Sequence, residues 1–272
     1  MTAGKSLVQW EQAEVERSRV QATLSANVTA TRRDIFERYA NPPADTAFPL
    51  EYLFHVVGDV RGRQVLDYGC GDGGDSALLA SRGAFVHALD LSDDLLRRAK
   101  GRLELDGLDH LVTMHCGSAH QIPLPDASID VVIGHAVLHH LDLALAQQEV
   151  FRVLKPGGRA IFLEPVRGSR LLRAIRPLIP YRQPDVSPFE RPLLPSEIDT
   201  FSRPFERGRR REFMLPFVAV ARVLGTSEAF QHRLRLIDRR LLEKYPALRL
   251  YATITMFELL KPAVPPTRAD EA

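Results

Sequence analysis

The sequence from Val65 to Gly74 reads Val65-Leu66-Asp67-Tyr68-Gly69-Cys70-Gly71-Asp72-Gly73-Gly74. An apolar run enters a cluster of glycines, and a helical pattern over Asp75–Arg82 follows the cluster. Glycines permit a tight turn and let backbone N–H groups approach a ligand closely. The stretch therefore predicts a strand, a ligand-binding turn and a helix in succession.

The same alternation of apolar runs and helical stretches continues on both sides of this turn. We expect strands at Gln64–Tyr68, Phe85–Leu91, Leu111–Cys116, Ile129–His135, Ala160–Glu164, Glu212–Phe217 and Tyr251–Leu260. We expect helices at Asp75–Arg82, Ser92–Glu104, Leu143–Val153 and Ser227–Lys244, with further helical segments around Trp10 and at Asp34–Ala40. This pattern is typical of a parallel sheet covered on both faces. It predicts an α/β fold with a Rossmann-like, seven-stranded, mostly parallel sheet.

Three regions are expected along the chain. Residues 1–50 form an N-terminal helical lid, residues 51–165 form the Rossmann-like core, and residues 166–272 form a cap insertion with the last two strands of the same domain. The segment 166–211 is much longer than a normal connection and carries prolines, arginines and aromatic residues such as Tyr181 and Phe189. Two interpretations remain open for it: a cap over a bound molecule, or a structural lid or dimer contact.

The composition excludes several classes of protein. The 272 residues carry a net charge of +2, with 45% hydrophobic and 26% charged residues, so the sequence indicates a globular chain without the basic excess of a nucleic-acid binder. Two cysteines, Cys70 and Cys116, cannot build a disulfide framework, and no spacing indicates a metal site. No apolar run is long enough to cross a membrane, and no signal-peptide core is visible. We expect a cytoplasmic protein without a metal.

The arginines are unevenly distributed. Only five of the 36 basic residues are lysines, and 17 of the arginines lie between Arg167 and Arg249. A GC-rich coding sequence explains such an excess without any function. A surface that meets an anionic substrate or an acidic partner also explains it, and both interpretations remain open.

Two kinds of cofactor fit the glycine-rich turn. Gly69, Gly71 and Gly74 satisfy the dinucleotide pattern G-x-G-x-x-G, and Asp90, at the end of the second strand, can accept both hydroxyls of a ribose. Asp67 would repel a pyrophosphate, however, whereas it would attract an ammonium group. A nicotinamide-dependent oxidoreductase is therefore an alternative, and a cofactor without phosphates is favoured.

Five motifs in the same order carry a resemblance to a known family. They are Asp67-x-Gly69-x-Gly71-x-Gly73, Leu89–Ser92 around Asp90, Gly117–Pro123, Ile129–Val132 followed by Leu138–Leu141, and Leu154–Gly158. In this respect the sequence resembles the class I S-adenosylmethionine-dependent methyltransferases, particularly the small-molecule branch related to types 11 and 25. The resemblance covers about Glu51–Pro165 and returns weakly in the last strand.

The resemblance implies S-adenosyl-L-methionine as cofactor and S-adenosyl-L-homocysteine as product. The positions that it implies for cofactor binding are Asp67, Gly69, Cys70, Gly71, Gly73, Asp90, Leu91, Ser118, Ala119 and His135. Ser118 is a departure, because the family usually has an aspartate there that binds the adenine amino group. A serine hydroxyl is a weaker acceptor than a carboxylate.

The resemblance also implies that the reactive methyl group faces the ends of the fourth and fifth strands. His139, His140 and Glu164 are the candidate catalytic residues there. We expect methyl transfer to a small-molecule acceptor, such as an apolar compound with an acidic group, in secondary metabolism, with oxygen favoured over nitrogen or carbon. Peptide, lipid and quinone acceptors, and a non-catalytic cofactor-binding partner protein, remain alternatives. Neither a monomer nor a homodimer is favoured.

Overall fold

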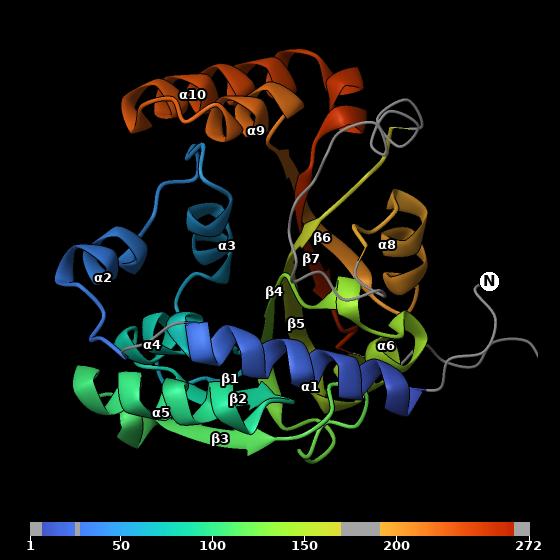
Figure 1. Ribbon diagram of the computed structural model, residues 1–272. Helices are drawn as coiled ribbons and strands as arrows, with labels where there is room; N and C mark the ends of the chain where they lie inside the picture. The colour runs from blue at the N-terminus through green and yellow to red at the C-terminus, as the bar shows by residue number, and fades with distance from the viewer. Residues whose placement is uncertain (1–6, 25–27, 170–190, 264–272) are drawn as a thin grey trace, which may run out of the picture.

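A computed structural model describes residues 7–24, 28–169 and 191–263 of the chain. Its centre is a seven-stranded sheet with the order β3-β2-β1-β4-β5-β7-β6 (Figure 1). The strands are β1 Gln64–Tyr68, β2 Phe85–Asp90, β3 Val112–Cys116, β4 Ile129–His135, β5 Leu154–Pro165, β6 Glu206–Phe213 and β7 Ile254–Leu260. The first five strands are mutually parallel, and β7 runs antiparallel to both β5 and β6. The predicted Rossmann-like, mostly parallel sheet is confirmed.

Helices cover both faces of this sheet. The α-helices are α1 Leu7–Leu24, α2 Arg33–Ala40, α3 Pro49–Val57, α4 Gly74–Ser81, α5 Asp93–Asp106, α6 Leu143–Val153, α8 Pro195–Phe201, α9 Pro216–Val223 and α10 Glu228–Lys244. Short 3-10 turns lie at Asp109–Leu111 (η1), Leu138–His140 (η2) and Pro246–Tyr251 (η4). The pair α9 and α10 lies at the top of Figure 1, beyond the strands, while α1 runs across the front. None of the helices within the described ranges is long and apolar enough to cross a membrane.

Two apolar layers hold the helices against the sheet. On one face Phe54 of α3 and Leu79 of α4 pack with strand residues such as Ile133, and all three are fully buried. On the other face Val150 of α6 packs in a cluster that contains Phe162 of β5. Each side chain of this size contributes about 1.5–3 kcal/mol when it is removed from water. This packing holds the helices against both faces of the sheet and so fixes the positions of the loops at the ends of the strands.

The buried strands lie where the sequence predicts them. Gln64–Tyr68 and Ile129–His135 begin and end where the sequence predicts, because a strand buried on both faces is a continuous apolar run. The predicted strand Glu212–Phe217 is wrong for most of its length. The strand there is Glu206–Phe213, and helix α9 begins at Pro216. An arginine run, most of it exposed, forms this edge strand, which is a common way to protect a sheet edge.

Three helices were not expected from the sequence: α3, α8 and α9. Proline is the first residue of each, where its missing N–H costs no hydrogen bond. Residues 170–190, which include Tyr181, Arg182 and Phe189 of the expected cap, lie outside the described residues.

The strand order creates a site at one edge of the sheet. From β1 the chain passes to β2 and β3 on one side, and then returns to β4 and β5 on the other. Ligands of such sheets bind at the carboxyl ends of the strands where this reversal occurs. The loops after Tyr68 and His135 meet at that point.

Candidate active site

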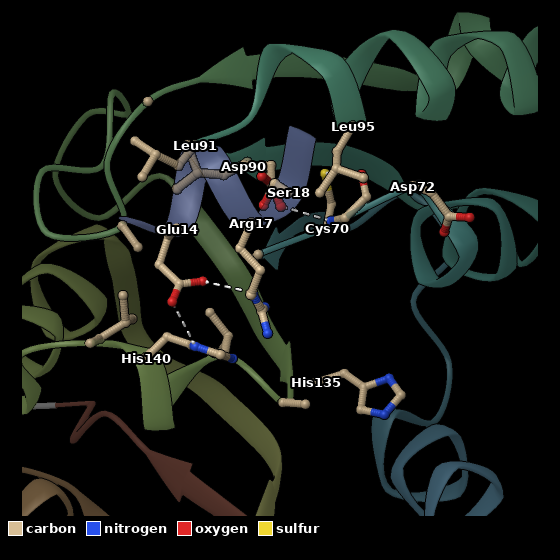
Figure 2. A pocket seen from close by; sticks show the side chains of 18 of the residues that line it. Glu14, Arg17, Ser18, Cys70, Asp72, Asp90, Leu91, Leu95, His135 and His140 are labelled. Atoms are coloured by element: carbon tan, nitrogen blue, oxygen red, sulfur yellow. Dashed lines mark hydrogen bonds and ion pairs between the residues drawn. The ribbon is translucent and has the colours of Figure 1, made fainter. Parts of the chain in front are cut away.

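A cavity of about 500 Å³ lies at the carboxyl ends of β1 to β4 (Figure 2). The loops after these strands form its base, and residues of α1 form one wall. The lining residues are Glu11, Glu14, Arg17, Ser18, Gly69, Cys70, Gly71, Asp72, Gly74, Asp75, Leu89, Asp90, Leu91, Leu95, Gly117, Ala119, His120, His135, Ala136, Val137, His140 and Leu141. This volume lies within the usual range for small-ligand sites.

The glycines of the turn after β1 have different tasks. Gly69, Gly71 and Gly73 all have positive φ, between 54° and 80°. A Cβ at Gly69 would lie 2.6 Å from Val137, and a Cβ at Gly73 would lie 2.8 Å from Ala99 of α5. At Gly71 a Cβ would meet nothing within 4 Å, and Gly71 lines the cavity. Gly69 and Gly73 therefore allow close packing, and Gly71 leaves room for a ligand.

Asp90 is held at the end of β2 by the backbone. Its Oδ2 accepts a hydrogen bond from Gly71 N at 2.9 Å, and its Oδ1 accepts one from Ser92 N at 2.9 Å. Burial raises the pKa of Asp90. Asp90 lines the cavity with Leu91, so its oriented carboxyl group is suited to accept hydrogen bonds from a diol.

Asp67 lies behind the turn and not among the cavity-lining residues. It is 2% exposed and accepts a hydrogen bond from Ser76 Oγ at 2.6 Å. Burial, and then the nearby charge of Asp75, raise the pKa of Asp67 to about 7. In this position Asp67 connects β1 to α4 and supports the turn.

The loop after β3 meets helix α1. Ala119 lines the cavity, and its carbonyl accepts a hydrogen bond from the Tyr68 hydroxyl at 2.5 Å. Ser118 is not among the cavity-lining residues, and its hydroxyl donates to Glu11 of α1. The carboxylate at this end of the cavity therefore comes from the N-terminal helix.

The histidines that follow β4 differ in their surroundings. His135 is 40% exposed, and its Nδ1 lies 2.9 Å from Asp75 Oδ2. Burial lowers the pKa of His135, but the hydrogen bond and charge of Asp75, with the charges of Glu164 and Asp67, outweigh this effect, so the pKa is raised.

His140 lines the cavity, with Nδ1 3.3 Å from Glu14 Oε1. Figure 2 shows His135 apart from the group of Glu14, Arg17 and His140.

His139 and Glu164 lie beneath the cavity. Glu164 is fully buried; its Oε1 accepts from the N–H groups of Val137 and Leu138 at 2.9 and 2.8 Å, and its Oε2 lies 2.8 Å from His139 Nδ1. His139 is buried and is not among the cavity-lining residues. This pair fixes the loop from which His140 reaches the cavity.

Several cavity residues were not predicted from the sequence: Glu11, Glu14, Arg17, Ser18, Asp75 and His120. Glu11 and Glu14 are three residues apart on α1, and Ser18 follows four residues later, so they share one face of the helix. This spacing was the available signal, but it does not reveal what the face covers. Within the described residues no group of His, Cys, Asp and Glu could hold a metal ion.

Known proteins resemble this chain over the part that carries most of the cavity-lining residues. The family profile described as "Methyltransferase domain" matches residues 66–162. The chain is 38% identical over 136 residues to the dimethylglycine N-methyltransferase of Parasynechococcus marenigrum, with 47% of this chain and 48% of that protein covered. It is 38% identical over 153 residues to the malonyl-[acyl-carrier protein] O-methyltransferase of Serratia marcescens, with 53% and 58% covered. The chain thus spans about half the length of these curated relatives.

A solved structure has the same fold over nearly the whole chain. The geranyl diphosphate C-methyltransferase from Streptomyces coelicolor A3(2) superposes with a TM-score of 0.62 and 13% identity, covering 94% of this chain and 100% of that one. With the profile match to residues 66–162 and the two relatives, this identifies the domain. The chain carries a methyltransferase domain of the class I S-adenosylmethionine-dependent family.

Proposed function

We propose that this protein binds S-adenosyl-L-methionine and transfers its methyl group to a small-molecule acceptor. The observation that carries the proposal is the cavity at the ends of β1 to β4, in which Gly71 leaves room for a ligand and Asp90 presents an oriented carboxyl group. The profile match to residues 66–162 covers this part of the chain and supports the same activity.

The charge of the cavity favours this cofactor over a dinucleotide. Its walls carry five carboxyl groups and one arginine, from Glu11, Glu14, Asp72, Asp75, Asp90 and Arg17. The cofactor has a sulfonium and an ammonium group against one carboxylate, so its net charge is positive. A pyrophosphate would place two negative charges among these acids, which is unfavourable in a partly buried site.

We assign the cofactor contacts by their chemistry. Asp90 accepts the ribose hydroxyls, and the backbone from Gly69 to Gly71 faces the amino-acid end, with Cys70 and Leu91 along the wall. Ala119 lies beside the adenine. Asp67 and Gly73 maintain the turn without touching the ligand. The bound cofactor supplies an electrophilic methyl carbon, and the protein aligns it with the acceptor.

His135 is the best placed general base, although the sequence alone favours His139 or His140. Because Asp75 binds Nδ1, the proton of the neutral ring stays on that nitrogen and Nε2 remains able to accept one. An acceptor hydroxyl would lose its proton to Nε2 as its oxygen takes the methyl group, while the bond between that carbon and sulfur breaks and S-adenosyl-L-homocysteine leaves. His139 and Glu164 act as positioning residues, and His140 forms part of the wall.

The acceptor is a small molecule, and we favour an oxygen nucleophile because of His135 and its partner Asp75. The names of similar proteins include a sterol C-methyltransferase, a dimethylglycine N-methyltransferase and an acyl-carrier-protein O-methyltransferase, so they cover carbon, nitrogen and oxygen. We propose a role in secondary metabolism, with lipid, quinone or peptide acceptors as alternatives within the same reaction.

Titration calorimetry with S-adenosyl-L-homocysteine and with NAD tests the cofactor assignment. We expect the protein to bind S-adenosyl-L-homocysteine and not NAD. In Asp90→Ala the affinity for S-adenosyl-L-homocysteine should fall at least about 10-fold, because that variant lacks a charge-assisted acceptor. Binding of NAD alone would contradict the proposal and favour an oxidoreductase. Circular dichroism of Asp90→Ala confirms that the variant folds.

A further inference from the structure

Glu11 reaches from helix α1 to the loop that follows β3. It lines the cavity, its side chain is 26% exposed, and it accepts a hydrogen bond from the Ser118 hydroxyl. His120 Nδ1 lies 3.2 Å from the same carboxylate oxygen, Oε1. Residues more than one hundred positions apart therefore meet at one end of the cavity.

The hydrogen bonds of His120 fix which of its nitrogens carries the proton. Asp142 N donates to His120 Nε2 at 2.9 Å, so Nε2 is an acceptor and the proton of the neutral ring is on Nδ1. His120 Nδ1–H and the Ser118 hydroxyl thus both donate to Oε1 of Glu11. This arrangement orients the carboxylate and leaves Oε2 with its capacity to accept a hydrogen bond from a ligand.

The surroundings of Glu11 suit a flat ring with an amino group at its edge. Leu91, Ala119 and Leu141 line the same cavity and offer apolar contacts to the faces of a ring. Asp90, the acceptor that we assign to the ribose, ends β2, and the chain after the neighbouring β3 carries Ala119. A base attached to that ribose would therefore extend toward the loop where Glu11 is bound.

We propose that Glu11 accepts a hydrogen bond from the exocyclic amino group of the adenine of the cofactor. Ser118 then orients Glu11 instead of meeting the base itself. Because Glu11 belongs to α1, recognition of the base also helps to hold this helix over the cavity, where Glu14 and Arg17 of the same helix form part of the wall. This inference rests on the proposed function.

The competing interpretation is that Glu11 only attaches α1 to Ser118 and His120. Both interpretations predict weaker cofactor binding when Glu11 is changed, so affinity alone does not separate them. They differ in the atoms of the ligand that matter. A carboxylate that meets the amino group discriminates against a base that lacks it, whereas a helix attachment weakens all bases equally.

The test compares S-adenosyl-L-homocysteine with S-inosyl-L-homocysteine, which has a carbonyl oxygen in place of the amino group. Calorimetry of the full chain with both ligands gives the ratio of their dissociation constants. We expect wild type to prefer the adenosyl ligand and Glu11→Gln to reduce that preference by about 10- to 100-fold, since a charge-assisted hydrogen bond is lost and the glutamine amide can donate to a carbonyl.

Two further variants complete the experiment. Glu16→Gln changes an exposed acid of the same helix and should leave the ratio unchanged. Adding Ser118→Asp to Glu11→Gln should restore the preference, because the aspartate returns a carboxylate to that end of the cavity. An unchanged ratio in Glu11→Gln would overturn the inference alone. Failure of wild type to bind S-adenosyl-L-homocysteine would overturn the proposed function as well.

Discussion

Glu164 and His139 connect two neighbouring strands beneath the cavity, with Glu164 Oε2 2.8 Å from His139 Nδ1. Glu164 belongs to β5, and His139 lies in the turn that follows β4. The other oxygen of Glu164 holds the backbone N–H groups of Val137 and Leu138, so one buried side chain satisfies three donors. Residues of this turn, including Val137 and His140, line the cavity. The geometry of the candidate active site therefore depends on a residue that lies outside the cavity.

Replacing Glu164 with glutamine is expected to destabilise the fold by about 2–4 kcal/mol, because the amide keeps one acceptor and turns a donor toward His139 or Val137. Urea unfolding of Glu164→Gln measures this loss. Glu104→Gln, at an exposed acid of α5, is the matched control and should change stability by less than about 0.5 kcal/mol. Equal stabilities of the two variants would contradict the anchoring role of Glu164.

The pair of His135 and Asp75 predicts a specific dependence of methyl transfer on pH. Since the pKa of His135 is raised above its usual 6.5, the base is protonated below that raised value and kcat should increase with pH through it. NMR titration of the ring measures the pKa, and Asp75→Asn should lower it, because the hydrogen bond and charge that raise it are removed.

Variants at His135 test whether the pKa of this histidine governs the pH dependence of methyl transfer. His135→Gln should reduce kcat by about 10²- to 10⁴-fold and remove the rise with pH, measured with the acceptor once it is identified. His110→Gln, at an exposed histidine, is the control. If His140→Gln instead removed the rise with pH while His135→Gln kept it, the base would be His140.

Two glycines of the turn should respond differently to substitution by alanine, Gly71 mainly in ligand binding and Gly73 mainly in stability. Gly71→Ala adds a methyl group where the cavity is open, so it should weaken S-adenosyl-L-homocysteine binding by more than about 10-fold while costing about 1–2 kcal/mol of stability. Gly73→Ala drives a Cβ into Ala99 and should cost about 2–5 kcal/mol. Calorimetry and urea unfolding measure the two effects.

Gly107→Ala provides the control for these variants. Gly107 also has positive φ, and an added methyl group would enter open space there, but this glycine caps α5 away from the cavity. Gly107→Ala should therefore show the backbone cost of Gly71→Ala without the loss of binding. Equal binding losses in Gly71→Ala and Gly107→Ala would mean that strain, and not occupation of the cavity, weakens the affinity.

The raised pKa of Asp67 predicts that the stability of the folded protein depends on pH. Its pKa is about 7 in the folded protein against an ordinary 3.8, so between these values the folded state holds a proton that the unfolded state releases. This contribution to stability therefore decreases as pH rises from about 4 to about 7, and is constant above that. Asp67→Asn keeps an oxygen that can accept from Ser76 and removes the titration.

Thermal unfolding of wild type and Asp67→Asn at several pH values measures this effect. The difference in Tm between the variant and wild type should shift in favour of the variant as pH rises, and should level off above about 7. Comparing the two proteins cancels, to first order, the titration of groups that do not interact with Asp67. A difference that does not depend on pH would contradict the raised pKa of Asp67.

The sequence could predict the parts of the fold whose burial is continuous. The strands β1 and β4 were located because both of their faces are covered and their apolar runs stand out between polar loops. The edge strand β6 could not be located in this way, since five of its first six residues carry charge and its pairing with β7 depends on the tertiary fold. The helix α3 was missed because its apolar run is short and begins at Pro49.

The residues of the candidate site also fall into two groups: those whose position the sequence could predict and those whose position depends on the tertiary fold. Gly69, Gly71 and Asp90 stand next to strand ends, and a strand end has a known place in a parallel sheet, so their meeting at the cavity could be predicted. Glu11 reaches the cavity because α1 folds back across the sheet, and no local pattern encodes where a distant helix lies. His139 and His140 are adjacent in the sequence, and only the fold decides that His139 contacts Glu164 while His140 lines the cavity.

Supplying the protein with methyl-labelled S-adenosyl-L-methionine and a fractionated cell extract tests whether it transfers a methyl group to a small molecule. We expect label to appear in a small, organic-soluble product, and Asp90→Ala to abolish this transfer. If wild type binds S-adenosyl-L-homocysteine yet transfers no label to any fraction, the protein is a non-catalytic cofactor-binding protein. Label confined to protein or RNA would contradict a small-molecule acceptor, because the acceptor would then be a macromolecule.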